Sequence, residues 1–124
     1  MTGSRARRLL REEMERRYYR LRQFLACYLH EDWPEFYGSP QRAIDVAISE
    51  YPIELRQQVR KELATLLDEA PDDVELREKL NNGLGVCVYF KEPGEARAFA
   101  LDAEERLMTS IKKHFRPGDE GVGQ

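Results

Sequence analysis

The stretch Cys27-Tyr28-Leu29-His30-Glu31-Asp32-Trp33-Pro34-Glu35-Phe36-Tyr37-Gly38-Ser39-Pro40 decides how this chain is organised. It holds four of the twelve Phe, Tyr and Trp residues and one of the two histidines. Pro34 ends a helical pattern that arrives from upstream. Ser39 and Pro40 begin a new one, because a serine side chain caps free helix amides and proline suits the first helical position. We interpret Trp33, Phe36 and Tyr37 as a hydrophobic joint between two helices, with an aromatic anchor at a protein interface as the alternative.

Apolar residues recur at helical spacing on both sides of this stretch. Upstream, the stripe from Leu10 to Tyr28 predicts one amphipathic helix over about 5–30. Downstream, the pattern predicts helices over 40–51, 53–69, 73–82 and 103–115, the last one opened by a capping box of Asp102 and Glu105. The expected fold class is therefore all-α, a compact bundle of about five helices, with at most a short extended segment near 86–90.

Length and composition predict one domain with two appendages. A chain of 124 residues suits a single core. We expect a basic N-terminal helical extension over 1–15, a helical domain over 16–116 and a flexible tail over 117–124. The apolar runs are too short to cross a bilayer, and the basic N-terminus lacks the apolar core of a signal peptide, so a cytoplasmic protein without a membrane partner is expected.

The net charge of −3 hides an asymmetry along the chain. Residues 1–22 carry eight Arg and three Glu, whereas the remainder carries 12 Lys and Arg against 20 Asp and Glu. An acidic body argues against nucleic-acid binding by the body and suits a basic protein partner. Nucleic-acid binding by the Arg-rich segment from Arg5 to Arg22 is an alternative, although a solvated helix face explains that segment equally simply.

Catalytic and metal-binding motifs are absent from the sequence. His30 and Asp32 could form an acid–base pair or hold a metal, but the only other histidine is His114, and no His-x-x-x-His, Cys-x-x-Cys, calcium loop or phosphate loop accompanies them. A structural hydrogen bond is the expected role of His30. We therefore expect no enzyme, no cofactor and no metal. Cys27 and Cys87 are expected to be reduced core cysteines rather than a disulfide.

Three segments of the chain resemble one known family. The segment Leu21-Arg22-Gln23-Phe24-Leu25-Ala26-Cys27-Tyr28-Leu29-His30-Glu31-Asp32-Trp33, then Tyr37-Gly38-Ser39-Pro40 and Ala43-Ile44, is similar to immunity proteins of bacterial contact-dependent growth inhibition. The resemblance covers roughly 16–116. It implies a small, largely helical, non-enzymatic protein that binds and neutralises the C-terminal toxin domain of a cognate secreted effector. Such toxins are often nucleases with basic surfaces. The matched signature positions, which we interpret as structural, are Tyr28, His30, Asp32, Trp33, Tyr37 and Gly38.

The densest acidic cluster is the predicted toxin-binding surface. Its members are Asp68, Glu69, Asp72, Asp73, Glu75 and Glu78. Acidic residues also favour helix N-termini for reasons unrelated to binding, so a solvated helix start is the competing interpretation. A helical adaptor or regulatory protein that binds some other protein is the alternative function.

Overall fold

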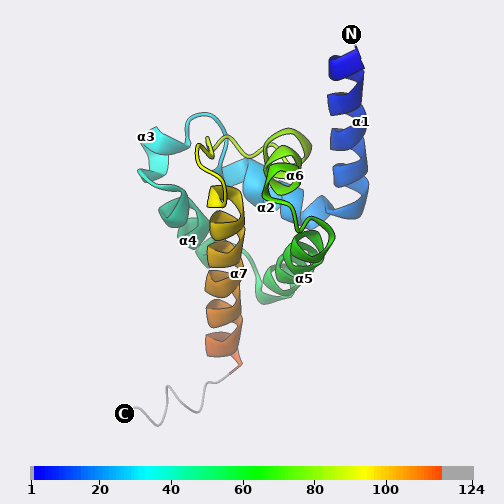
Figure 1. The fold of residues 1–124 in the computed structure, drawn as a ribbon. Coiled ribbons are helices and arrows are strands. Elements are labelled where there is room, and N and C mark those ends of the chain that lie inside the picture. The colour runs from blue at the N-terminus through cyan, green and yellow to red at the C-terminus, as the bar shows by residue number, and fades with distance from the viewer. Residues whose placement is uncertain (1, 116–124) are drawn as a thin grey trace, which may run out of the picture.

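The computed structural model describes residues 2–115, which form helices and connecting loops without any β-strand (Figure 1). The predicted all-α class is confirmed. These residues contain seven α-helices and one π-helical turn rather than about five helices. In chain order the elements are α1 Thr2–Arg17, α2 Tyr19–Tyr28, α3 Trp33–Tyr37, α4 Pro40–Glu50, α5 Ile53–Glu69, α6 Asp73–Glu78, the π-turn η1 Lys79–Gly83, and α7 Glu95–His114. The tail predicted over 117–124 lies outside the described residues.

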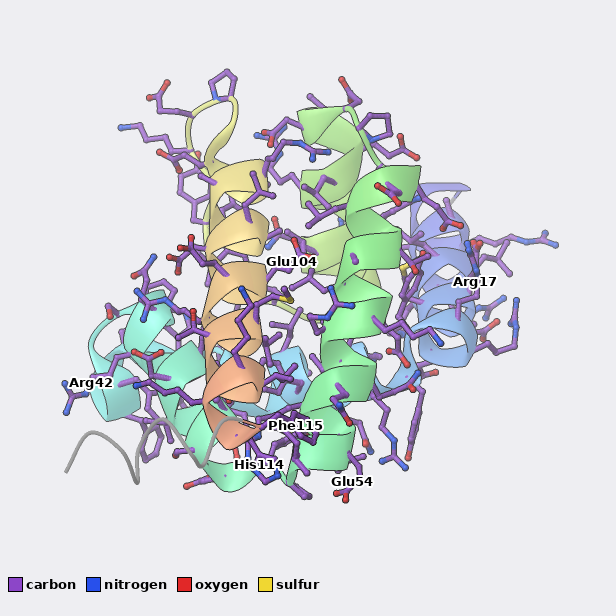
Figure 2. The ribbon with its side chains drawn as sticks, turned by 90° about the horizontal axis from the view of Figure 1, so that it is seen from below. Arg17, Arg42, Glu54, Glu104, His114 and Phe115 are labelled. Atoms are coloured by element: carbon purple, nitrogen blue, oxygen red, sulfur yellow. The ribbon has the colours of Figure 1, made fainter. Side chains whose placement is uncertain are left out.

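Helices α5 and α7 lie side by side at the centre of the molecule (Figures 1 and 2). Helix α4 covers α7 on one side, while α2 packs against α5 and α1 packs against η1. Fully buried side chains from four of these helices meet in the core, among them Phe24, Ile44, Leu63 and Leu107. No helix in the described part of the chain combines the length and hydropathy that a membrane crossing requires.

The predicted single helix over 5–30 is wrong, because the chain breaks at Tyr18. This residue leaves the helical region with φ −131° and ψ 49°. Its buried hydroxyl donates a hydrogen bond to Glu69 of α5, and Glu62 of α5 accepts a hydrogen bond of 2.8 Å from the Leu21 amide. The Glu62 carboxylate thus caps the first turn of α2. One apolar stripe serves two helices, because its halves pack against different partners.

Residues 27–40, here called the signature joint, contain a further helix. Helix α2 ends at Tyr28, and Pro34 lies in the first turn of α3 rather than at the end of the preceding helix. The Trp33 indole nitrogen donates a hydrogen bond of 2.7 Å to the Cys87 carbonyl, which ties the joint to the segment 85–91. The predicted cap is confirmed, since the Ser39 hydroxyl accepts a hydrogen bond of 3.1 Å from the Arg42 amide.

Helix α7 begins eight residues before its predicted start. The Asp73 carboxylate accepts hydrogen bonds from the amides of Gly94 (2.8 Å) and Arg97 (3.0 Å), so the helix is capped from α6. Asp102 lies inside the helix and bonds Arg106, four residues on, at 2.7 Å. The predicted capping box is therefore wrong, because a tertiary cap replaces a local one.

The segment 85–91, near the short extended stretch predicted at 86–90, is neither helix nor strand, and hydrogen bonds to other parts of the chain hold it in place. The Asn81 amide donates hydrogen bonds to the carbonyls of Val86 (2.7 Å) and Val88 (3.0 Å). The Cys87 amide donates a hydrogen bond of 2.8 Å to the Leu29 carbonyl. Both cysteines are free, but Cys27 and Cys87 are exposed, so the predicted core position is wrong for each. Cys27 lies off the buried stripe of Phe24 and Leu25.

Candidate functional site

Charged groups lie at the surface of this protein. Among residues 5–115, no buried position holds a charged side chain. Within the described range, no cluster of three His, Cys, Asp or Glu residues is placed to hold a metal ion. The surface is therefore where a functional site has to be sought.

The signature positions are engaged within the fold. The Tyr28 hydroxyl donates a hydrogen bond to Glu50, and the ring of Tyr28 packs beside that of Tyr37 with centroids 6.2 Å apart. His30 accepts a hydrogen bond of 3.1 Å at Nδ1 from the Asp32 amide. Gly38 ends α3 with φ 84°, a backbone conformation that favours glycine. These contacts hold the signature joint together.

The six predicted toxin-binding carboxylates lie at the end of α5, in the following turn and in α6. We call them the acidic corner: Asp68, Glu69, Asp72, Asp73, Glu75 and Glu78. All six lie within eleven consecutive positions of the sequence, which include the turn between α5 and α6. Their roles in the fold differ from one another.

Four members of the acidic corner bond other parts of the chain. The Glu69 carboxylate accepts hydrogen bonds from Arg17 at 2.6 and 2.7 Å and from the Tyr18 hydroxyl. Asp72 caps α6 by accepting a bond of 3.1 Å from the Glu75 amide, and Glu75 forms an ion pair of 3.2 Å with Lys79. Asp73, described above, caps α7. These four carboxylates stabilise the corner.

The Glu69 carboxylate also has a shifted acidity. Hydrogen bonds from Tyr18 and Arg17 hold the pKa of Glu69 below its ordinary value of 4.5. Burial, followed by the hydrogen bond to Glu69, raises the pKa of Tyr18 above its ordinary value. At neutral pH this contact therefore joins a carboxylate, a guanidinium and a neutral phenol.

Asp68 and Glu78 are the free members of the acidic corner. Both are exposed, and neither forms a hydrogen bond or an ion pair within residues 2–115. Val74, at four positions before Glu78 on the same face of α6, leaves 61% of its surface exposed. The corner thus presents two unneutralised carboxylates and one apolar side chain. Sequence reasoning missed Val74, although its place off the buried stripe of Leu76 and Leu80 was a usable signal.

The basic N-terminal segment is partly neutralised. Arg17 pairs with Glu13 at 3.5 Å as well as with Glu69, and Arg22 pairs with Glu15 at 3.5 Å. Arg22 is therefore held near the end of α1, across the break at Tyr18. Through these ion pairs, Arg17 connects α1 to α5 and Arg22 of α2 connects to α1.

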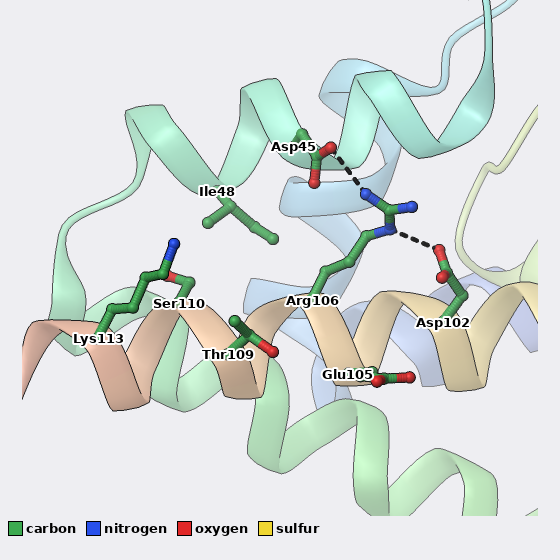
Figure 3. Close-up of a pocket in the computed structure, with 8 residues that line it drawn as sticks. All are labelled: Asp45, Ile48, Asp102, Glu105, Arg106, Thr109, Ser110 and Lys113. Carbon is green, nitrogen blue, oxygen red and sulfur yellow. Dashed lines mark hydrogen bonds and ion pairs between the residues drawn. The ribbon is translucent and has the colours of Figure 1, made fainter.

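A groove runs between α4 and α7 on another face of the molecule. One part of it has a volume of about 450 Å³ and is lined by Asp45 and Ile48 of α4 and by one face of α7 (Figure 3). The Arg106 guanidinium donates bonds of 2.7 Å to both Asp45 and Asp102. Those two carboxylates raise the pKa of Arg106, so the guanidinium stays charged.

The residues that the structure describes form a small all-helical protein with its charged groups at the surface. Residues 17–119 match the family model described as CdiI immunity protein, so the chain belongs to this immunity protein family. Comparison with curated proteins and with solved structures gave no match. The match begins at the last residue of α1 and includes the signature joint, the acidic corner and α7.

Proposed function

We propose that this protein binds the toxin domain of its cognate contact-dependent growth inhibition effector and neutralises it in the cytoplasm of the producing cell. The observation that carries the proposal, beside the family itself, is the free part of the acidic corner. Asp68 at the end of α5 and Val74 and Glu78 on α6 are each exposed, whereas the other carboxylates of the corner are engaged in the fold. Binding alone, without catalysis or a cofactor, performs this function.

Electrostatics gives the acidic corner a partner of defined chemistry. Beyond residue 22 the chain carries 20 Asp and Glu against 12 Lys and Arg, so the body attracts cationic surfaces. Long-range attraction of this kind raises the association rate, whereas short-range apolar contact slows dissociation. A basic toxin surface, such as the substrate cleft of a nuclease, fits both the field of the corner and the apolar contact at Val74.

Neutralisation then follows from occlusion. A toxin domain that acts on a polyanion needs cationic side chains at its active surface. Carboxylates that pair with these side chains occupy the position of the substrate phosphates and exclude the substrate. Asp68 and Glu78 need no rearrangement to do this, because no internal bond within residues 2–115 has to break first.

The proposal is tested by reversing charge at two matched pairs of positions. The test variant is Asp68→Lys with Glu78→Lys. The control is Glu31→Lys with Glu54→Lys, which changes net charge equally at exposed carboxylates outside the corner. Glu54 lies at the opposite end of α5 from Asp68, about 21 Å along the helix (Figure 2). Association and dissociation rates with the purified toxin domain of the cognate effector are measured at about 10 mM and about 150 mM salt.

The test variant is expected to lower the association rate about 10-fold at low salt, with a smaller difference at the higher salt concentration. The control is expected to lose much less. An equal loss in both pairs would show that net charge matters and the corner does not. Association of the test variant at the wild-type rate, with wild-type salt dependence, would refute the corner as the docking surface. Failure of the wild-type protein to bind the toxin at all would refute the function and favour an adaptor for another protein.

A further inference from the structure

Helix α7 carries two neighbouring faces of different character. One face is buried in the core through Ala96, Phe99, Ala100, Ala103 and Leu107. The other lines two open depressions and repeats at helical spacing over five turns. Its members are Glu95, Ala98, Phe99, Asp102, Glu105, Arg106, Thr109, Ser110 and Lys113. Helix α4 and the segment 85–91 cover this second face only in part: Arg106 bonds Asp45 of α4, and Phe99 packs on Phe90, while Ala98, Glu105, Thr109 and Lys113 are exposed.

The two depressions adjoin each other at Asp102, which lines both of them, and we refer to them together as the α4–α7 groove. The first, of about 370 Å³, lies between the segment 85–91 and the first turns of α7. The second, of about 450 Å³, lies between α4 and the later turns of α7 (Figure 3). From Ala98 to Lys113 the groove extends about 22 Å along the helix. At about 3.3 Å per residue, an extended segment of six or seven residues spans this length.

The first depression is suited to an apolar side chain. Phe90 and Phe99 form its floor, with ring centroids 5.4 Å apart. Tyr89 stands at its edge with 83% of its surface exposed. Tyrosine is among the residue types that dominate binding energy at protein interfaces, since it buries a large ring and keeps a polar tip. Nothing within residues 2–115 requires Tyr89 to be exposed.

The second depression is suited to a basic side chain. Asp45 and Asp102 hold the guanidinium of Arg106 between them, so these two carboxylates are engaged within the chain (Figure 3). Glu105 lines the same depression and forms no hydrogen bond or ion pair within residues 2–115. Over the whole groove the carboxylates of Asp45, Glu95, Asp102 and Glu105 outnumber the cations of Arg106 and Lys113. The groove is therefore anionic overall.

We propose that this α4–α7 groove is a second docking surface and that it receives an extended segment of the toxin in which an apolar side chain is followed by a basic one. The proposal rests on the proposed function. It assigns the two surfaces different tasks: the acidic corner speeds association, and the groove holds the complex through Tyr89 and Glu105. The apolar side chain enters beside Tyr89, and the basic one lies against Glu105.

Two single variants test the groove, Tyr89→Ala and Glu105→Lys, together with the control Leu101→Ala. Leu101 is an exposed apolar residue of α7 that lines neither depression. Circular dichroism melting checks that each variant is folded. Dissociation from the toxin domain is expected to become about 10-fold faster for each groove variant. The association rate of Tyr89→Ala, which leaves the charge unchanged, should change little, whereas Glu105→Lys should also slow association at low salt. The control is expected to dissociate at the wild-type rate.

The outcomes separate this proposal from the proposed function. Wild-type dissociation by both groove variants, with wild-type binding intact, overturns the groove and leaves the function standing. Absence of toxin binding by the wild-type protein overturns both. Light scattering over a range of protein concentrations detects the competing occupant, a second copy of this chain. Self-association that Glu105→Lys abolishes would assign the groove to that copy and overturn the toxin segment.

Discussion

The signature joint and the acidic corner use their polar groups in opposite ways. In the joint, Tyr28 bonds Glu50, the Trp33 indole bonds a distant carbonyl, and Ser39 caps α4. In the corner, carboxylates engaged in the fold stand beside Asp68 and Glu78, which have no partner within residues 2–115. Tyr28, Trp33 and Ser39, on which the resemblance to the family was first based, are thus bonded within the fold. Recognition of a partner requires side chains that the fold leaves free.

The largest expected effect comes from Trp33→Ala in the signature joint. The substitution removes a half-buried ring packed against the core and the hydrogen bond to the Cys87 carbonyl. We expect the free energy of unfolding to fall by about 2–3 kcal/mol, from lost packing and an unpaired carbonyl. Urea unfolding followed by circular dichroism measures this, because Trp33 is the only tryptophan and its fluorescence is lost with it. Toxin affinity of the folded variant should stay at the wild-type value.

A change in toxin affinity on Trp33→Ala, at urea concentrations where the variant is folded, would break the comparison. The matched variant Trp33→Phe keeps most of the packing and removes only the hydrogen bond. Its expected loss is about 1 kcal/mol.

Asp73→Ala is expected to have the next largest effect. Asp73 belongs to the acidic corner, but its carboxylate is bonded within the fold, as the polar groups of the signature joint are. Its carboxylate caps α7 through the amides of Gly94 and Arg97. We expect a loss of about 1–2 kcal/mol in the free energy of unfolding, which is typical of a lost helix cap. Equilibrium urea unfolding measures it. Asp68→Ala is the matched control, because this exposed aspartate bonds nothing within residues 2–115 and should stay within about 0.5 kcal/mol of wild type. Equal losses in the two variants would mean that Asp73 does not cap α7.

The fold could be predicted where its signals are local. Helices α4 and α5 follow the sequence closely, because Ser39-Pro40 and Pro52 mark their starts and each buries one clean apolar face. The break at Tyr18 depends on Glu62 and Glu69, more than 40 residues further along the chain. The start of α7 likewise depends on Asp73. Tertiary caps of this kind leave no trace in a local pattern.

The candidate site could be predicted only as a region. Composition identified the acidic stretch 68–78. The sequence alone does not distinguish carboxylates that are free to bind a partner from carboxylates that are bonded within the fold. The structure separates Asp68 and Glu78 from the four that are bonded, because the separation depends on where Arg17, Lys79 and the start of α7 lie. The groove was not predicted, since it joins α4 to α7 across about 60 positions, as the contact of Asp45 with Arg106 shows.

Gly38→Ala tests the joint without removing any contact. Gly38 has φ 84° and an added methyl group would meet nothing within 4 Å, so backbone strain is the only cost. We expect the free energy of unfolding to fall by about 1 kcal/mol, as for other residues forced into the left-handed region. Thermal unfolding measures the shift, with Gly38→Asn as the matched variant, because asparagine tolerates this conformation better. Equal effects of Ala and Asn would argue against strain as the cause.

The smallest expected effect is a pH dependence of stability at Glu69. This residue is engaged in the fold and lies next to Asp68, which is free. Hydrogen bonds from Tyr18 and Arg17 lower the pKa of Glu69 in the folded protein. Because its pKa is lower in the folded protein, the ionised carboxylate stabilises the fold fully at pH values above its ordinary pKa of 4.5. This stabilisation is lost as the pH falls through the lower pKa of the folded protein. Glu69→Gln should therefore be less stable than wild type at pH 7, and the difference should shrink as the pH falls below 4.5 and through the lowered pKa of the folded protein. Urea midpoints across this range measure it. A constant difference at every pH would mean that the ionised carboxylate is not what holds Tyr18.

Glu69 is already neutralised by Arg17, so Glu69→Gln should change the association rate with toxin less than Asp68→Asn does. That result would show that Glu69 belongs to the scaffold and that its neighbour Asp68 belongs to the binding surface.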